Sequence, residues 1–398
     1  MRLAANIDKI RSALCWMIAL WLMIGSAQAE VTVYLEDDLK VTFSSGSFDN
    51  RNLNGDMQNV AVFIDDHRLL TADDVQVETS GEAGTANHMI KRLRMTNVFF
   101  DDLPLSIKSI FIQDMASTFF SDFSEQSAQM NAITDSSKAT LTGVAHAADG
   151  ISMTIDSITS TPFTFRTLAN GEPFMTKLGL QIENMILTPL QNRGSFAQFI
   201  SATGEPNLTL NLTQTQMNEI NNGVVSSDIV LKTTMNGIGN FDANFGLQMS
   251  VDSYNKLFMS DTYELEADDI EDVALDEMTI VFADHGAVKA VLHMSATQQN
   301  VDYAVARDQV IMTIRSALGG FLPGSSKDLM PPLESFVRDG GELRLSALPA
   351  KPFPFVTFAQ YIFAPDAAVK ELNLTLTQTP HDQGTNAVTV QKTKIVVR

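Results

Sequence analysis

The chain contains very little cysteine and tryptophan. Its 398 residues include one Cys and two Trp, and all three (Cys15, Trp16 and Trp21) lie close to the N-terminus. The rest of the chain therefore has no disulfide, no thiol nucleophile and no thiolate ligand for a metal. Small secreted domains use disulfides because their cores are small, whereas a chain of this length can bury a large core without them.

Long apolar runs are also lacking. The longest, residues 13–25, has about thirteen residues, fewer than the roughly 20 that are needed to span a bilayer. Basic residues precede this run, and Ala27 and Ala29 follow it with the small side chains that signal peptidase requires. We predict that residues 1–29 are a cleaved signal peptide and that the mature chain begins at Glu30, in the periplasm of a bacterium or outside the cell. An uncleaved membrane anchor is the alternative.

Positive charge is scarce. Lys and Arg number 27 against 47 Asp and Glu, which gives a net charge of −20. Such a chain repels nucleic acids and anionic lipid headgroups. No second apolar run is long enough to cross a bilayer, so we expect no integral membrane span in the mature chain. The densest acidic stretch, residues 264–277, is interpreted as a solvated connection, with weak contacts to a cation or a basic partner as the alternative.

Catalytic motifs are missing as well. The chain has no Gly-x-Ser-x-Gly elbow, no phosphate-binding glycine loop, no dinucleotide fingerprint and no His-Glu-x-x-His pair. Ser253 and Lys256 match Ser-x-x-Lys, but the companion motifs of that chemistry are absent. We therefore assign no catalytic, cofactor-binding or metal-binding residue and expect a protein that is not an enzyme. A hydrolase whose site is assembled from distant residues is a less favoured alternative.

One loose group of potential metal ligands occurs at Asp284, His285 and His293. The two histidines are eight residues apart across a possible turn at Gly286, so a hairpin would bring their rings together. A metal site needs three or four converging ligands, and this group offers at most three. We interpret it as an ordinary hairpin turn.

Apolar and polar residues alternate with a period of two through most of the chain, with Gly, Asn, Asp and Ser between the runs. So many half-buried strands predict a β-dominated α+β fold, with antiparallel sheets and a few short helices. The clearest predicted strands are 31–35, 39–43, 90–98, 106–112, 151–158, 178–187, 208–213, 229–234, 245–251, 278–282, 288–294, 343–347 and 388–397.

Helical patterns are fewer. An apolar stripe predicts a helix near 302–318, with Asn300 as its N-cap and Gly319 at its end. A second helix is predicted at 331–339, with its two prolines in the first turn and glycines after it. A third is expected near 115–133.

An internal similarity links two parts of the chain. Residues 196–215 begin with Phe-Ala-Gln-Phe-Ile and residues 358–379 begin with Phe-Ala-Gln-Tyr-Ile. Both segments end with an alternating Leu/Thr/Asn strand followed by Thr-Gln-Thr. We hypothesise two related β-rich modules, 30–235 and 236–398, with chance similarity between amphipathic strands as the alternative.

Phenylalanine and methionine supply much of the apolar inventory, with 24 Phe and 19 Met against 5 Tyr. These side chains can line a deformable apolar cavity, although they can equally fill an ordinary core. We expect a non-catalytic envelope or periplasmic protein that binds an apolar or lipid-like ligand. A structural or protein-interaction module of the cell envelope is the alternative. The sequence leaves the identity of the ligand or partner and the oligomeric state open.

Overall fold

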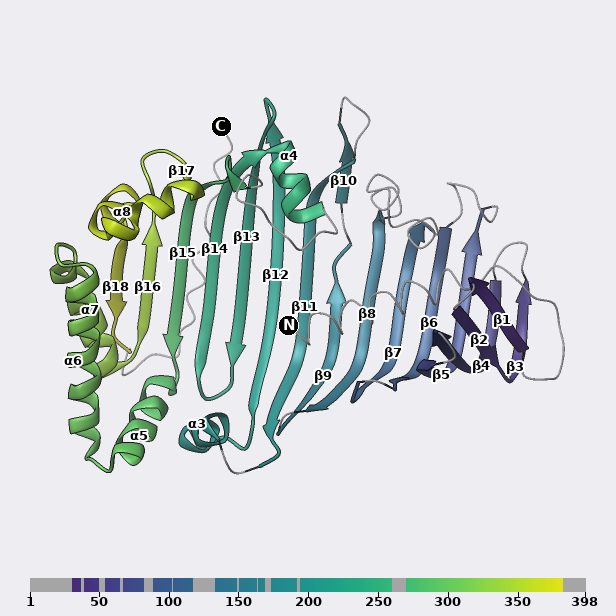
Figure 1. The fold of residues 1–398 in the computed structure, drawn as a ribbon, viewed down its shortest axis with the longest axis horizontal. Helices are drawn as coiled ribbons and strands as arrows, with labels where there is room; N and C mark the ends of the chain where they lie inside the picture. Colours follow the sequence, from purple (N-terminus) through teal and green to yellow (C-terminus); the bar gives the residue numbers. More distant parts are fainter. Residues whose placement is uncertain are drawn as a thin grey trace.

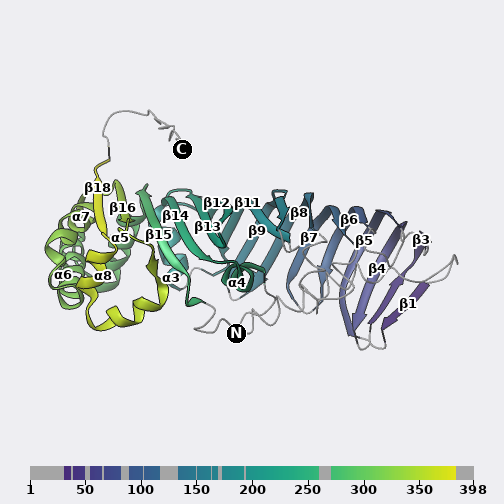
Figure 2. The ribbon, with the colours of Figure 1, turned by 90° about the horizontal axis from the view of Figure 1, so that it is seen from above.

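The structure, a computed structural model, describes residues 31–381 except 37–38, 50–53, 65–66, 82–88, 102, 117–132, 149, 163, 169–172, 192–193 and 260–269. Within these residues the chain forms one large antiparallel sheet (Figure 1). Seen from above, the sheet is a single twisted layer, with α5 to α8 at its C-terminal end and α4 near its middle (Figure 2). The predicted signal peptide and the predicted strand 388–397 lie outside the described residues.

The strands are β1 (Val31–Glu36), β2 (Leu39–Phe43), β3 (Ser45–Asp49), β4 (Asn54–Ile64), β5 (His67–Ser80), β6 (Met89–Phe100), β7 (Leu105–Ala116), β8 (Ile133–Ala148), β9 (Ile151–Ser160), β10 (Thr164–Thr167), β11 (Pro173–Pro189), β12 (Leu208–Asn221), β13 (Val224–Met235), β14 (Gly239–Ser250), β15 (Ala274–Asp284), β16 (Glu342–Ala347), β17 (Phe353–Pro354) and β18 (Thr375–Thr379). The helices are α3 (Ser195–Thr203), α4 (Val251–Tyr254), the π-helical turn η2 (Asn255–Met259), α5 (Ala287–Gln299), α6 (Tyr303–Phe321), α7 (Ser326–Asp339), the 3₁₀ segment η4 (Phe355–Phe363) and α8 (Pro365–Glu371).

The sheet is a meander in which almost every strand pairs with the next one in the chain. Strands β4 to β9 pair in order, β9 pairs with β11, and β11 to β16 pair in order up to the last described strand, β18. Short connections favour this antiparallel arrangement. The predicted β-dominated antiparallel fold is thereby confirmed.

The two similar segments lie at different places in this sheet. Residues 196–200 belong to α3, and residues 208–215 lie in β12, which pairs with both β11 and β13. Residues 358–362 belong to η4, and the strand that follows, β18, pairs with β16 among the described strands. Both segments run from a helix into a strand, but one strand is internal and the other lies at the end of the described sheet. The two-module hypothesis is not confirmed.

The predicted strand 288–294 is wrong, because these residues lie in helix α5. The carboxylate of Asp284 accepts hydrogen bonds from the backbone N–H groups of Gly286 and Val288 and so satisfies the start of the helix. Leu292 and Ala296, four residues apart, are buried, which is the spacing of a helix face. The mixed Ala, Val and Leu composition of this stretch imitates alternation.

The prediction for 302–318 is correct in type but not at its ends. Asn300 does not cap α6; it ends α5 in a left-handed conformation with φ of 50°, and Asp302 precedes α6. Gly319 and Gly320 lie inside α6, which continues to Phe321.

Helix α7 contains the predicted helix 331–339 but begins five residues earlier, at Ser326, so its prolines are inside the helix rather than in the first turn. Buried Met330 packs against Leu292 and Ile311 of the neighbouring helices. This packing stabilises the first turn of α7, which precedes the prolines. The expected helix near 115–133 cannot be compared for 117–132, which lie outside the described residues, while residues on either side belong to β7 and β8.

A line of mostly polar residues crosses the sheet from the β2–β3 junction to β11. In the β4–β5 ladder, for example, the pairs on either side of Asn59 are in register, which places Asn59 opposite Asp73. In each following ladder, the registers in the same way place one residue of this line opposite the next. We call these residues the polar row: Ser44, Asn59, Asp73, Asn97, Lys108, Gly143, Asp156 and Asn184.

Every second residue of the polar row has a left-handed backbone. The φ angles of Asn59, Asn97, Gly143 and Asn184 are 53°, 50°, 60° and 49°. Gly and Asn adopt this conformation at the lowest cost. The side chain of Asn97 also donates a hydrogen bond to Asp73 (2.7 Å), and that of Asn184 donates one to Asp156 (2.9 Å).

In each strand, the apolar residues before and after the polar row point to the same face of the sheet. The two apolar residues that flank the row in a strand are three positions apart in the sequence, instead of the usual two. Both are nevertheless buried in β6, where Met95 and Val98 are 1% and 0% exposed. The two residues between them, Thr96 and Asn97, are half-buried and exposed. The flanking residues of the other strands belong to the same hydrophobic cluster, which forms the N-terminal core.

The polar row ends between β11 and β12. The register of this ladder shifts by one between Ile182 and Met185, so two residues of β11 oppose Asn211 of β12 in a β-bulge. The backbone N–H of Asn184 donates a hydrogen bond to the Asn211 side chain (2.8 Å). From β12 to β14 the ladders contain no shift. The sheet therefore has two regions of different construction that meet at this bulge.

Candidate functional site

The second region presents a broad apolar face. Alternate residues of six neighbouring strands, β11 to β16, point to the same side of the sheet, and their side chains are half-buried. We call this surface the apolar face; it comprises Leu178, Leu180, Ile182, Met185, Leu187, Leu208, Leu210, Leu212, Ile229, Leu231, Met235, Phe241, Phe245, Leu247, Met278, Ile280, Phe282, Leu343 and Leu345. In the N-terminal core, by contrast, most apolar side chains from β4 to β7 are buried, and Ile182 and Met185 of β11 pack against that core.

Charge is confined to the other side of the same strands. The intervening positions carry Lys177, Glu183, Glu219, Asp228, Lys232, Asp242, Glu277, Glu342 and Arg344. On the apolar side the described residues of these strands include one charged group, Asp284, which is at the end of β15 and is used to cap α5. The half-exposed apolar face is thus almost free of charge.

Helices border this face. Phe336 of α7 packs edge-to-face on Phe282 of β15, with ring centroids 6.1 Å apart. At the opposite ends of the strands, Tyr254 of α4 contacts β12, and Phe353 and residues beside α8 pack against β15 and β16. Figure 1 shows these helices at the two ends of the strands and beside β18.

A buried polar network fixes α4 on the sheet. The side-chain amide of Asn218 donates to the Tyr254 hydroxyl (2.8 Å) and to the Met175 carbonyl (2.9 Å). Gln216 donates to Asn218 (3.1 Å) and to the Ser227 hydroxyl (3.2 Å). Burial raises the pKa of Tyr254. Because its hydroxyl stays protonated and hydrogen-bonded, this network is suited to holding the helix rather than to proton transfer.

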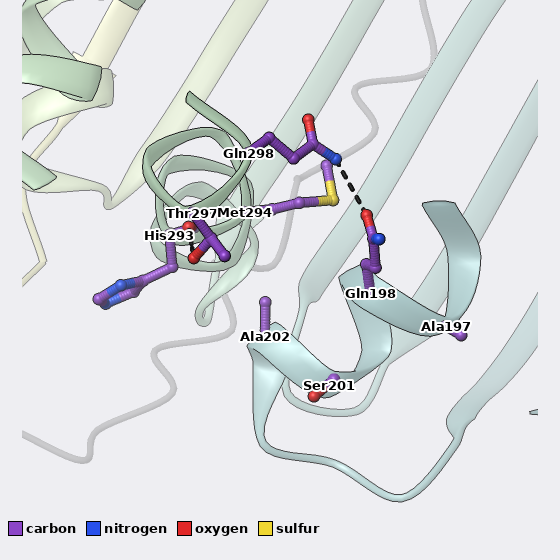
Figure 3. A pocket seen from close by; sticks show the side chains of 8 residues that line it. All are labelled: Ala197, Gln198, Ser201, Ala202, His293, Met294, Thr297 and Gln298. Atoms are coloured by element: carbon purple, nitrogen blue, oxygen red, sulfur yellow. Dashed lines mark hydrogen bonds between the residues drawn. The ribbon is translucent and has the colours of Figure 1, made fainter. Parts of the chain in front are cut away.

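A groove of about 810 Å³ lies between α3 and α5 (Figure 3). Both helices lie at the end of the sheet where β12 starts and β15 ends. Gln298 donates a hydrogen bond to Gln198 (3.0 Å) and so links the two helices, with Met294 and Ala202 beside this bridge. His293 also lines the groove, with its ring pointing away from α3, so the groove combines amide, hydroxyl and thioether groups with one imidazole.

Asp284, His285 and His293 are not brought together, and the expected hairpin turn is wrong, because helix α5 follows Gly286. His285 stacks on His381, with ring centroids 6.2 Å apart, whereas His293 packs on Tyr303 at 4.8 Å. The Asp284 carboxylate accepts hydrogen bonds from backbone N–H groups at the start of α5. Across the part of the chain that the structure describes, no group of three or more His, Cys, Asp or Glu residues could hold a metal ion.

The Ser-x-x-Lys match lies at helix α4, where it has a structural role. Ser253 is buried, and its backbone N–H donates to the Ser250 hydroxyl at the helix start (3.1 Å). Burial acts to raise the pKa of Asp272, but hydrogen bonds from Ser250 and Ser253 outweigh it and lower that pKa. These contacts tie the start of α4 to the segment before β15.

The acidic stretch 264–277 is interpreted as a connection, but its last part is strand. Residues 264–269 lie outside the described residues, and Asp276 and Glu277 belong to β15. Burial raises the pKa of Asp228 on β13, two strands from β15, and the charges of Glu219 and Asp276 raise it further.

Comparisons with known proteins cover only part of the chain. A family model described as "Uncharacterized protein" matches residues 232–379, which run from within β13 to the end of β18. No curated protein matches the chain. None of the described helices is long and apolar enough to cross a membrane. The matched part includes strands β14, β15 and β16 of the apolar face, the last four residues of β13 and most of the helices around the face.

Proposed function

We propose that this protein is a non-catalytic binding protein of the bacterial envelope, and that its ligand is an apolar, lipid-like molecule lying on the apolar face. One observation carries the proposal: most alternate residues on one side of six strands are apolar and half-buried, with polar Gln214 and Thr233 and buried Ala243 among them, while the charges of the same strands lie on the other side. The envelope location is supported by the signal peptide predicted for residues 1–29.

The extent of the apolar face favours an extended ligand. Six strands at a spacing of about 4.8 Å span roughly 24 Å. Monomeric proteins rarely leave a continuous apolar surface of such extent uncovered. Each half-buried Leu, Ile or Phe that a ligand covers contributes about 1 kcal/mol to binding. The nearly uncharged surface and the net charge of −20 select an apolar body rather than an anionic group.

The proposal is tested by native mass spectrometry of the protein purified from its own envelope without detergent. We expect a mass above that of the chain, and release of an apolar molecule into organic solvent when the protein is denatured. A bare chain mass, together with no binding when the protein is incubated with mixed lipids, would contradict the proposal.

A second function, a protein-interaction module, is favoured by the edge strand β18. Among the described strands β18 pairs with β16 alone, and helix α7 lies beside it, where the Gln378 side chain accepts a hydrogen bond from the Ser335 hydroxyl and donates one to the Gly340 carbonyl. The sequence of Thr375–Thr379 has no charge and no proline, and its ladder has no bulge, so helix α7 is the protection that the described residues give this edge. Crosslinking in envelope extracts tests this alternative, because an edge partner would be trapped through β18 and not through the apolar face.

A further inference from the structure

The segment from Pro352 to Pro365, here called the aromatic segment, differs in composition from the rest of the protein. It contains no charged residue in fourteen positions, although 19% of the chain is charged. Four phenylalanines and one tyrosine lie within it, at Phe353, Phe355, Phe358, Tyr361 and Phe363. The segment forms β17 and η4.

The inner side of the aromatic segment is held by edge-to-face and tilted ring contacts. Phe353 lies 5.1 Å from Phe358 and 5.6 Å from Tyr361, measured between ring centroids, and Phe355 lies 5.8 Å from Phe358. Phe353 is buried in the cluster that includes Leu275 of β15. These contacts make a firm base for the outward side chains.

The outer side presents apolar groups to solvent. Phe363 is 92% exposed and Val356 is 38% exposed, while Phe358, whose ring also packs on Phe353 and Phe355, is 42% exposed. Hydrophobic side chains exposed together on a rigid turn indicate a contact surface rather than a core. The segment also adjoins the apolar face, because β17 pairs with β15.

We propose that the aromatic segment docks the protein onto the surface of a lipid bilayer with zwitterionic headgroups. The charges favour this occupant. Fourteen uncharged residues enter a neutral interface without desolvating an ion, and aromatic rings are suited to the headgroup level. The net charge of −20 repels an anionic bilayer. The inference stands independently of the proposed ligand, since docking does not require that the apolar face carry a lipid.

The test is flotation of the protein with phosphatidylcholine vesicles. Phe363→Ser removes the most exposed ring of the aromatic segment, and Phe321→Ser is the matched control, because Phe321 is 62% exposed at the end of α6. We expect the unchanged protein and Phe321→Ser to float equally. Phe363→Ser should bind the vesicles at least about tenfold more weakly. Both the full chain and the chain that starts at Glu30 are measured, so that residues 13–25 do not contribute. Thermal melting confirms that all variants are folded.

Three results would overturn the inference. The first is no flotation of the unchanged protein with neutral vesicles. The second is equal flotation of Phe363→Ser and the unchanged protein. The third is a monomer–dimer change in Phe363→Ser without vesicle binding, which would assign the segment to contact with a second copy of the chain. Lipid carriage is measured separately for the same variants. A Phe363→Ser variant that loses vesicle binding but keeps its bound lipid supports this inference independently of the proposed function.

Discussion

The two regions of the sheet keep the same face apolar by different means. From β4 to β9 the polar row runs through strands whose apolar side chains remain on one side, and most of those side chains are buried. From β12 to β16 the row is absent, helices border the face, and the apolar side chains stay half-exposed. The comparison indicates that the first region is built for stability, and that the second leaves apolar surface available for a ligand.

The largest expected effect comes from placing the same polar residue in the two regions. Val98→Asn loses a fully buried side chain and buries an amide, so we expect a loss of about 3–5 kcal/mol in the free energy of unfolding. Leu231→Asn changes a half-buried position of the apolar face and should cost about 1 kcal/mol or less. Urea denaturation measures both. Equal losses would remove the distinction between the regions.

The next effect tests the left-handed positions of the polar row. Asn97→Val places a β-branched residue at φ of 50° and removes the hydrogen bond to Asp73, so we expect a loss of about 2 kcal/mol. Asn97→Gly keeps the backbone conformation and should change stability by less than about 0.5 kcal/mol. Thr213 is an exposed residue of the regular strand β12, and Thr213→Val is the control for introducing valine there. If Asn97→Val were as stable as Thr213→Val, the polar row would have no structural role.

The smallest effect concerns the charged side of the second region. The pKa of Asp228 is raised in the folded state by burial and by Glu219 and Asp276, so its ionisation opposes folding above its ordinary pKa. Asp228→Asn should therefore raise the melting temperature at pH 7 by about 1–2 °C. This gain should shrink as pH falls through the raised pKa and vanish below about 3.8, where Asp is protonated in both states. A gain that is equal at pH 3 and pH 7 would rule out this electrostatic cause.

Much of the strand content follows from alternation, but the polar row does not. Period-two patterns predict strands such as 178–187 and 208–213 because each has one half-buried face. The polar row breaks that period, and its signal is two apolar residues three apart with Asn or Gly just before the second, as in Met57–Val60, Met95–Val98, Leu141–Val144 and Ile182–Met185. Only the ladders show that these motifs are aligned across the sheet.

The candidate site was less predictable than the fold. Alternation indicates which residues share a side of a strand, but not whether another layer covers them. The half-burial of Leu231 and Phe245 belongs to the assembled sheet and its surroundings, which alternation does not register. Helix α5 was taken for a strand because its start depends on Asp284, whose capping bonds are a local feature that periodicity does not register.

The most direct test of the account compares two neighbouring residues of β13 that point to opposite sides of the sheet. Leu231 belongs to the apolar face, and Val230, equally half-buried, lies on the charged side. Lipid bound per chain is measured by native mass spectrometry for Leu231→Asn and Val230→Asn purified in the same way. The account predicts that Leu231→Asn loses most of the bound apolar molecule while Val230→Asn keeps it. Equal retention by the two variants would contradict the assignment of the ligand to the apolar face.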